Sequence, residues 1–147
     1  MKADGAYEAL FTAILGHVNP GDEVVIIEPY FDCYEPMVKL AGGTPVFISS
    51  KPVENSFNCL FSHTFIQTKT DGVITSADWK LDMEELKSKI SSKTKAIIYN
   101  NPNNPLGKVF TRDEISDICK IVIDNDLLMI SDEVYEHMVF DDNKMIR

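Results

Sequence analysis

The chain has 147 residues, enough for one domain with a sizeable core, and its 44% hydrophobic and 25% charged residues are ordinary for a globular protein. Its net charge of −9, without a cluster of lysine and arginine, argues against binding to the phosphate backbone of nucleic acids. No apolar run reaches the roughly 18 residues needed to span a bilayer, so we expect no membrane partner.

Strand-like and helix-like segments alternate along the chain. Apolar residues recur at helical spacing from Tyr7 to Val18, and a turn signal separates this helix from a fully apolar strand over Val24 to Ile27. The same reasoning predicts helices over Tyr34 to Ala41, Leu81 to Ile90 (N-cap Asp82) and Thr111 to about Asn125 (capping box), and strands over Pro45 to Ile48, Ala96 to Tyr99 and Leu127 to Ile130. This order predicts an α/β fold in three layers, with a mostly parallel sheet and helices on both faces.

The stretch from Val53 to Ser76 shows neither the helical nor the strand spacing of apolar residues. It holds scattered aromatic residues, and a structureless loop of this length is uncommon inside a compact domain. We expect it to be an atypical insertion and assign it no function. The chain also begins with a helix and stops at Arg147 without a terminal helix, so we expect it to be part of a larger protein.

Polar side chains collect where two of the predicted strands end. The run Asn100 to Gly107 follows one strand and Ser131 to Tyr135 follows another, and ligands of parallel α/β sheets bind at this rim. The Asp132 carboxylate could pair with a protonated ring nitrogen and turn a pyridine ring into an electron sink. The Tyr135 hydroxyl, three residues on, could bond a phenolate oxygen of the same ring.

Other residues at this rim could orient and anchor such a ring. The Asn100 and Asn104 side chains both donate and accept hydrogen bonds, and the prolines between and beside them stiffen the loop. Phe31 follows the strand Val24 to Ile27 and could stack on a planar ring. Ala6 and Tyr7 open the first helix, whose free N–H groups could bind a phosphate.

Each feature alone has an ordinary structural explanation. Asp132 could be a helix N-cap or a solvated loop carboxylate, and Tyr135 could be a partly buried tyrosine. The Asn-Pro run could be a simple turn, and Phe31 could be packed in the core. Taken together, the positions describe a site for pyridoxal 5′-phosphate.

Three segments carry a closer resemblance: Glu28 to Met37, Lys95 to Phe110 and Ser131 to Tyr135. They resemble the kynurenine aminotransferases, a group also known as glutamine transaminase K or cysteine-S-conjugate β-lyase, within the fold-type I aminotransferases of class I and II. The resemblance covers nearly the whole chain except about Val53 to Ser76. It implies that residues 1–147 are a partial aminotransferase large domain in which 53–76 is an insertion.

The resemblance also implies site residues. It assigns cofactor binding to Ala6, Tyr7, Phe31, Asn100, Asn104, Asp132 and Tyr135. Asn104 would contact the substrate carboxylate as well. The family bonds its cofactor, as a Schiff base, to a lysine in a downstream Ser-x-x-Lys segment; Lys144 lacks that context, and Ser92 to Lys95 matches a different family segment. The chain is therefore expected to hold no catalytic residue and to be inactive alone.

The implied reaction is transfer of an amino group from an aromatic or sulfur amino acid, kynurenine-like or glutamine-like, to a 2-oxo acid, with a homodimeric full-length enzyme. The alternatives are a cysteine-S-conjugate β-lyase of the same family, or a non-catalytic module that binds cofactor or full-length subunits. A dinucleotide-binding domain is disfavoured, because Gly5 to Glu8 is no GxGxxG motif. Three unpaired cysteines favour a reduced compartment, the cytoplasm, with the mitochondrion as the alternative for the full-length protein; the three histidines lack metal-ligand spacing.

Overall fold

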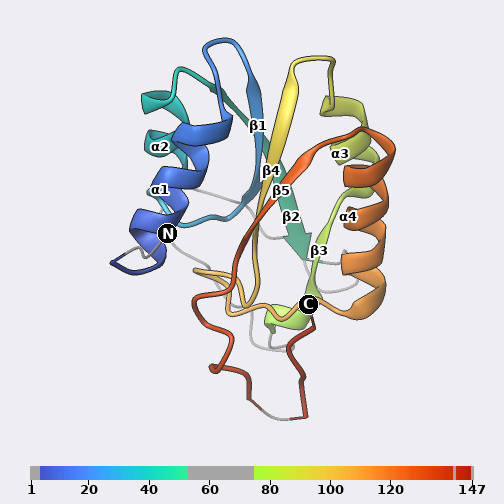
Figure 1. Cartoon of the computed structure of the whole chain (residues 1–147). Helices are drawn as coiled ribbons and strands as arrows, with labels where there is room; N and C mark the ends of the chain where they lie inside the picture. Colours follow the sequence, from blue (N-terminus) through green and yellow to red (C-terminus); the bar gives the residue numbers. More distant parts are fainter. Residues whose placement is uncertain (1–3, 53–74, 141, 147) are drawn as a thin grey trace, which may run out of the picture.

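The computed structural model describes residues 4–52, 75–140 and 142–146 (Figure 1). The strands of these described residues form a five-stranded sheet at its centre, in the order β3-β2-β1-β4-β5. The strands are β1 (Glu23–Glu28), β2 (Thr44–Pro52), β3 (Trp79–Leu81), β4 (Thr94–Asn100) and β5 (Leu128–Asp132). β1 pairs in parallel with β2 and β4, and β4 pairs in parallel with β5, whereas β3 is antiparallel to β2. The prediction of a mostly parallel sheet is confirmed.

The described residues form four α-helices, which cover the two faces of the sheet. The helices α1 (Ala6–His17) and α2 (Tyr34–Leu40) lie on one face, and α3 (Met83–Lys89) and α4 (Arg112–Asp124) lie on the other (Figure 1). The predicted three-layer arrangement is therefore confirmed, and each layer of helices covers its own hydrophobic cluster.

Alternation along β1 explains why both faces need a helical cover. Val24 and Ile26 pack into the cluster under α1 and α2, while Val25 and Ile27 pack into the cluster under α3 and α4. Successive side chains of a strand point to opposite faces, so an unbroken apolar run supplies both cores. All four side chains are buried, and this run is the central element of the fold.

Polar contacts set the starts of the two helices on the α3–α4 face. The Asp82 carboxylate accepts hydrogen bonds from the main-chain N–H groups of Glu84 and Glu85, which confirms it as the N-cap of α3. Thr111 and Glu114 form the predicted capping box of α4. These side chains satisfy main-chain donors that a helix start leaves without a partner.

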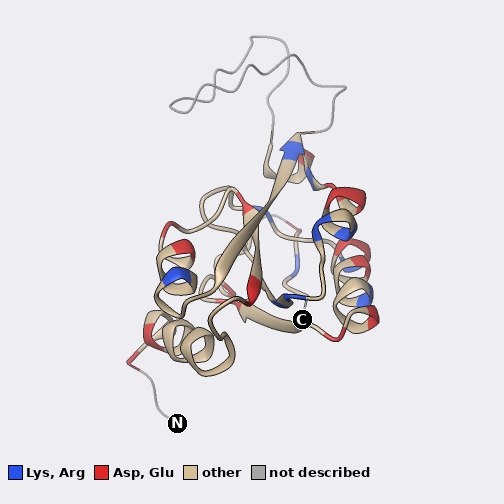
Figure 2. Ribbon diagram, turned by 90° about the horizontal axis from the view of Figure 1, so that it is seen from above, with Lys and Arg blue, Asp and Glu red and all other residues tan. Residues whose placement is uncertain are grey.

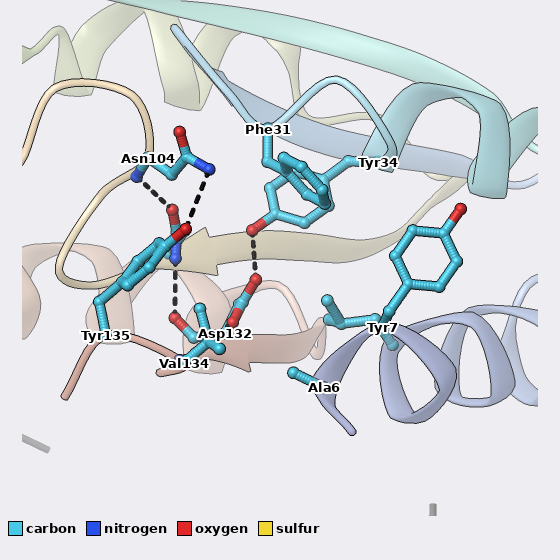
Figure 3. Close-up of a pocket in the computed structure, with 10 residues that line it drawn as sticks. Ala6, Tyr7, Phe31, Tyr34, Asn104, Asp132, Val134 and Tyr135 are labelled. Atoms are coloured by element: carbon cyan, nitrogen blue, oxygen red, sulfur yellow. Dashed lines mark hydrogen bonds between the residues drawn. The ribbon is translucent and has the colours of Figure 1, made fainter. Parts of the chain in front are cut away.

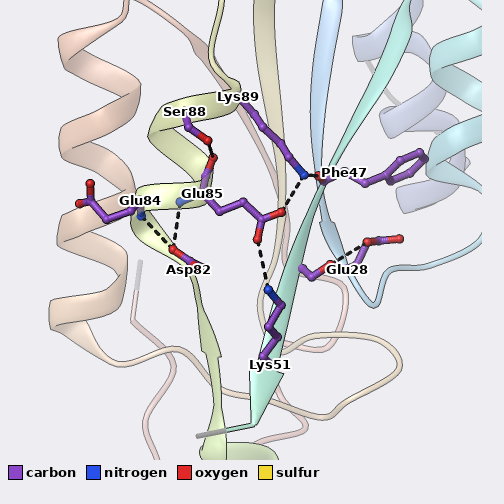
Figure 4. A network of polar contacts seen from close by, with 9 residues as sticks. Glu28, Phe47, Lys51, Asp82, Glu84, Glu85, Ser88 and Lys89 are labelled. Atoms are coloured by element: carbon purple, nitrogen blue, oxygen red, sulfur yellow. Dashed lines mark hydrogen bonds and ion pairs between the residues drawn. The ribbon is translucent and has the colours of Figure 1, made fainter. Parts of the chain in front are cut away.

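A charged network also ties α3 to β2 (Figure 4). Glu85 lies 2.7 Å from Lys89 and 3.6 Å from Lys51, and the Lys89 ammonium donates to the main-chain oxygen of Phe47 at 2.7 Å. α3 has only seven residues, too few for stability in isolation, and these contacts add to its apolar anchor Leu86.

The structure differs from the sequence-based expectation on one side of the sheet. Leu81 belongs to β3, and α3 begins at Met83. A 3₁₀ helix (Ser76–Asp78) precedes β3, and neither element was predicted. A three-residue strand is too short to show a period, and its place depends on pairing with the end of β2. The predicted insertion from Val53 to Ser76 lies outside the described residues except for its last two, Thr75 and Ser76.

Charge is unevenly distributed over the two helical layers. Figure 2 shows acidic and basic residues along α3 and α4, whereas α1 is almost free of them.

Among the helices that the structure describes, none has the length and apolar character to cross a membrane. Residues 4–52, 75–140 and 142–146 contain no group of three or more histidine, cysteine or acidic side chains that could hold a metal.

Candidate functional site

A cavity of about 170 Å³ opens at the carboxyl ends of β1, β4 and β5, beside the N-terminus of α1 (Figure 3). All of the sequence-predicted site residues line it: Ala6, Tyr7, Phe31, Asn100, Asn104, Asp132 and Tyr135. Leu10, Tyr34 and Val134 complete the lining. The structure therefore brings together residues that are more than 120 positions apart in the chain.

The strand order explains why the cavity forms at this place. From β1 the chain passes to β2 on one side, while β4 leads to β5 on the other. The loops after β1 and β4 therefore diverge, and open α/β sheets bind ligands in the crevice at such a point. β5 lies next to β4, with Asn100 and Asp132 in register, so polar side chains of both strands reach the same rim.

Asp132 is the buried acid of the cavity, with 6% of its surface exposed. Its Oδ2 accepts a hydrogen bond of 2.6 Å from the Tyr34 hydroxyl, and its Oδ1 accepts one of 3.2 Å from the main-chain N–H of Val134. An ionised carboxylate has about four acceptor positions, so two remain for a donor in the cavity. This geometry suits a cationic N–H of a bound ring.

The Asn100 amide makes two hydrogen bonds within the protein. Its Nδ2 donates to the main-chain oxygen of Asp132 at 3.0 Å, and its Oδ1 accepts from the main-chain N–H of Asn104 at 2.6 Å. The side chain is buried, with 4% exposed. It lines the cavity while tying the end of β4 to β5 and to the following loop.

Asn104 and Tyr135 together form a polar wall of the cavity. The Asn104 Nδ2 lies 3.4 Å from the Tyr135 hydroxyl, and both side chains are half-buried. Figure 3 shows the Asn104 amide and the Tyr135 hydroxyl next to each other on the same side of the site. Each can still donate to an oxygen of a bound molecule, because an amide nitrogen carries two hydrogens and a phenol one.

Phe31 and Tyr34 form the aromatic wall. Their rings meet edge to face, with centroids 5.7 Å apart and planes at 83°. Phe31 is half-buried, whereas Tyr34 is 2% exposed and belongs to the core under α1 and α2. Burial, followed by the hydrogen bond to Asp132, raises the pKa of the Tyr34 hydroxyl, which therefore remains a donor.

The N-terminus of α1 supplies the fourth wall. Gly5 is its N-cap, with φ 110°, and no side chain caps this helix. Ala6 and Tyr7, in the first turn, are exposed and line the cavity. The N–H groups of a first helical turn lack helical partners, and together with the helix dipole they favour an anion.

Lys95 and Lys144, the two lysines that the sequence analysis considered for the Schiff base, do not line the cavity. Lys95 is exposed near the amino end of β4, whereas the cavity lies at the carboxyl end of that strand. Lys144 is exposed as well. Among the residues that the structure describes, no lysine lines the cavity.

Tyr34 is the functional candidate that sequence reasoning missed. It lies three residues after Phe31, in the turn that leads into α2, and it is the first residue of that helix. Val134 lies between two predicted site residues, and Leu10 lies one helical turn after Ala6. Spacing could have suggested all three, but the contact between Tyr34 and Asp132 joins residues 98 positions apart.

Comparisons with known proteins identify the family of this chain. The family model of aminotransferase class I and II matches residues 3–147. Kynurenine–oxoglutarate transaminase 3 of Rattus norvegicus is 51% identical over 144 residues, which are 97% of this chain and 28% of that protein. The chain thus spans less than a third of the length of this relative.

Solved structures show the same fold. The structure of Bna3p, a putative kynurenine aminotransferase from Saccharomyces cerevisiae, matches with a TM-score of 0.84 and 37% identity over 97% of this chain and 30% of that one. Cystalysin from Treponema denticola, whose structure contains a pyridoxal 5′-phosphate cofactor, shares the fold with a TM-score of 0.76 at 22% identity over 96% of this chain and 30% of that one. By its match to the family model over nearly its whole length, the chain belongs to the aminotransferase class I and II family.

Proposed function

We propose that this chain forms the part of a pyridoxal-phosphate-dependent aminotransferase that holds and orients the cofactor ring. The observation that carries the proposal is the buried Asp132 carboxylate, which faces a cavity flanked by an aromatic ring and an uncapped helix N-terminus. A buried carboxylate is costly unless it is paired, and a cationic ring nitrogen would supply the missing charge.

The residues present fit each part of the cofactor. The first turn of α1, at Ala6 and Tyr7, suits the phosphate, and Phe31 suits the face of the ring. Asp132 suits the ring nitrogen, and the amide and phenol of Asn104 and Tyr135 suit the phenolic oxygen.

Pyridoxal phosphate, when bound, supplies an electron sink for bonds at the α-carbon of an amino acid. The chain's own residues prepare the ring for this role. Asp132 holds a proton at the ring nitrogen, because an adjacent negative charge favours the cationic form. Tyr135 donates to the phenolic oxygen and Phe31 fixes the plane of the ring, so the ring is oriented before an amino acid enters.

The relatives indicate a reaction of the longer protein. We propose that it transfers an amino group from an aromatic or sulfur amino acid to a 2-oxo acid, as a cytoplasmic homodimer whose remaining segments supply the lysine that bonds to the cofactor. The absence of a lysine from the described cavity wall favours a second candidate for the chain alone, a non-catalytic module that binds the cofactor reversibly. Carbon–sulfur β-elimination is the corresponding alternative reaction, since it needs the same electron sink.

Titration of the 147-residue chain with pyridoxal phosphate, followed by tryptophan fluorescence and equilibrium dialysis, tests the proposal. We expect saturable binding that Asp132→Asn weakens by tenfold or more, on the order of one lost charge-assisted hydrogen bond. Asp124→Asn is the matched control, because Asp124 is an exposed carboxylate paired with the exposed Lys120. Absence of binding, or equal binding by Asp132→Asn, would contradict the proposal.

Activity of the chain alone is the second test. We expect no transfer of the amino group from kynurenine to 2-oxoglutarate, even with pyridoxal phosphate present, because no lysine lines the described cavity. The assay follows the loss of kynurenine, with a full-length kynurenine aminotransferase as the positive control. Turnover by the purified chain would show that another group replaces the lysine.

A further inference from the structure

Tyr34 contacts two residues of the proposed cofactor site at once. Its hydroxyl donates to the Asp132 Oδ2 at 2.6 Å, and its ring meets the Phe31 ring edge to face at 5.7 Å (Figure 3). It lines the cavity with only 2% of its surface exposed, so most of the side chain is packed in the core.

The position of Tyr34 is fixed by the core. It is the first residue of α2, and it belongs to the same buried cluster as Met37 and Val38 of that helix and Leu10 of α1. Side chains in a close-packed cluster hold defined rotamers, so the hydroxyl has a defined place at the rim of the sheet. A group held in this way can orient a neighbouring side chain.

The Asp132 carboxylate is such a neighbour. It receives one hydrogen bond from the Tyr34 hydroxyl and one from the Val134 main chain, each to a different oxygen. Two donors from different elements fix the plane of the carboxylate, because rotation about the terminal bond would break both. The acceptor positions left free then point in a fixed direction.

We propose that Tyr34 is a positioning residue that aims the Asp132 carboxylate at the ring nitrogen of the cofactor and supports Phe31 against the face of the ring. The inference rests on the proposed function and extends it to a residue that acts through Asp132 and Phe31. Burial and the hydrogen bond raise the pKa of this hydroxyl, so it acts as a donor throughout the neutral pH range.

Tyr34→Phe tests the inference, because it keeps the ring and removes the hydroxyl. The two probes are pyridoxal phosphate and its deaza analogue, in which a carbon replaces the ring nitrogen. We expect the variant to bind pyridoxal phosphate on the order of tenfold more weakly, the loss typical of removing a group that orients a ligand's direct partner. Its affinity for the deaza analogue should stay within about twofold of the wild-type value, since Tyr34 acts through the contact of Asp132 with the nitrogen.

Tyr99→Phe is the matched control. Tyr99 is 3% exposed and lies in the other hydrophobic cluster, and its buried hydroxyl has no hydrogen-bond partner among the described residues. Loss of this hydroxyl should leave the affinity for both probes unchanged. A shared effect of the two substitutions would indicate general loosening of the core and would overturn the positioning role.

Two further outcomes separate this inference from the proposed function. Unchanged affinity of Tyr34→Phe for pyridoxal phosphate, alongside weakened binding by Asp132→Asn, would overturn the role of Tyr34 and leave the cofactor site intact. Equal losses for both probes would assign Tyr34 a purely structural role. Both probes are measured on the same preparation, so partial unfolding lowers both signals and cannot imitate the expected selectivity.

Discussion

Lys108 is the most buried charged side chain described in this protein, with 1% of its surface exposed. Its ammonium lies 3.0 Å from the Glu114 Oε1 and 5.0 Å from the centroid of the Phe110 ring. Lys80 reaches the same carboxylate oxygen at 3.1 Å. Glu114 also accepts a hydrogen bond from the main-chain N–H of Thr111 in the capping box of α4. The Glu114 carboxylate thus neutralises the charge of a buried ammonium and also caps the N-terminus of α4.

The pKa of Glu114 gives the size of this effect. Burial alone would raise the pKa, but the hydrogen bonds from Thr111, Lys108 and Lys80 lower it from 4.5 to about 2. That difference corresponds to roughly 3 kcal/mol of folding stability at neutral pH. Breaking a buried ion pair by removing one partner typically costs about 3–5 kcal/mol. Glu114→Gln, which keeps the shape of the cap, should therefore lower the free energy of unfolding by about 3 kcal/mol.

The effect should depend on pH with a definite sign. The pKa is lower in the folded state, so the stabilisation is complete above the unfolded value of 4.5 and is lost as pH falls toward 2. The difference between wild type and Glu114→Gln should shrink by more than half between neutral pH and about pH 3.

Urea unfolding at several pH values measures this difference. The chain's single tryptophan, Trp79, is 7% exposed and provides the fluorescence signal. Lys120→Gln is the control, because the Lys120–Asp124 pair is 74% and 54% exposed and should contribute under about 1 kcal/mol. A loss below about 1 kcal/mol for Glu114→Gln, or a loss independent of pH, would refute the reasoning.

Two further predictions concern glycines and a helix cap. A Cβ at Gly43 would lie 2.7 Å from the Val18 Cγ1, so Gly43→Ala should lower the free energy of unfolding by about 1–3 kcal/mol. A Cβ at Gly16 in α1 would meet open space, so Gly16→Ala should raise the free energy of unfolding by about 0.5–1 kcal/mol. Thermal unfolding of the two variants compares them directly, and equal effects would contradict the packing argument. Asp82→Ala should cost about 1 kcal/mol in urea unfolding by removing the N-cap of α3, and an unchanged midpoint would show that the cap contributes little.

Much of the fold follows from local sequence signals. The apolar run of β1, the N-cap at Asp82 and the capping box at Thr111 each specify their element through interactions within a few residues. β3 lacks such a signal, because three residues form a strand there only through pairing with the end of β2. Helix and strand ends also differ from the predicted ones by up to four residues, since hydrogen bonding to neighbours decides where pairing stops.

The site was predictable as a set of residues and less so as a set of contacts. The ends of predicted parallel strands indicate the rim, and all seven candidates line one cavity. Sequence spacing could not show that the Asn100 amide bonds the protein's own main chain. It also could not show that Tyr34 supports Asp132, because that contact exists only once α2 and β5 lie side by side.

The walls of the cavity come from α1, the loop after β1, the end of β4 and the end of β5. No short stretch of the unfolded chain can reproduce this arrangement, so a molecule that fits the cavity binds the native state alone. Such a ligand adds its binding free energy to the stability of the whole sheet, about 2.7 kcal/mol at a concentration one hundred times its Kd. The fraction of chains that are folded would therefore rise with the concentration of the cofactor.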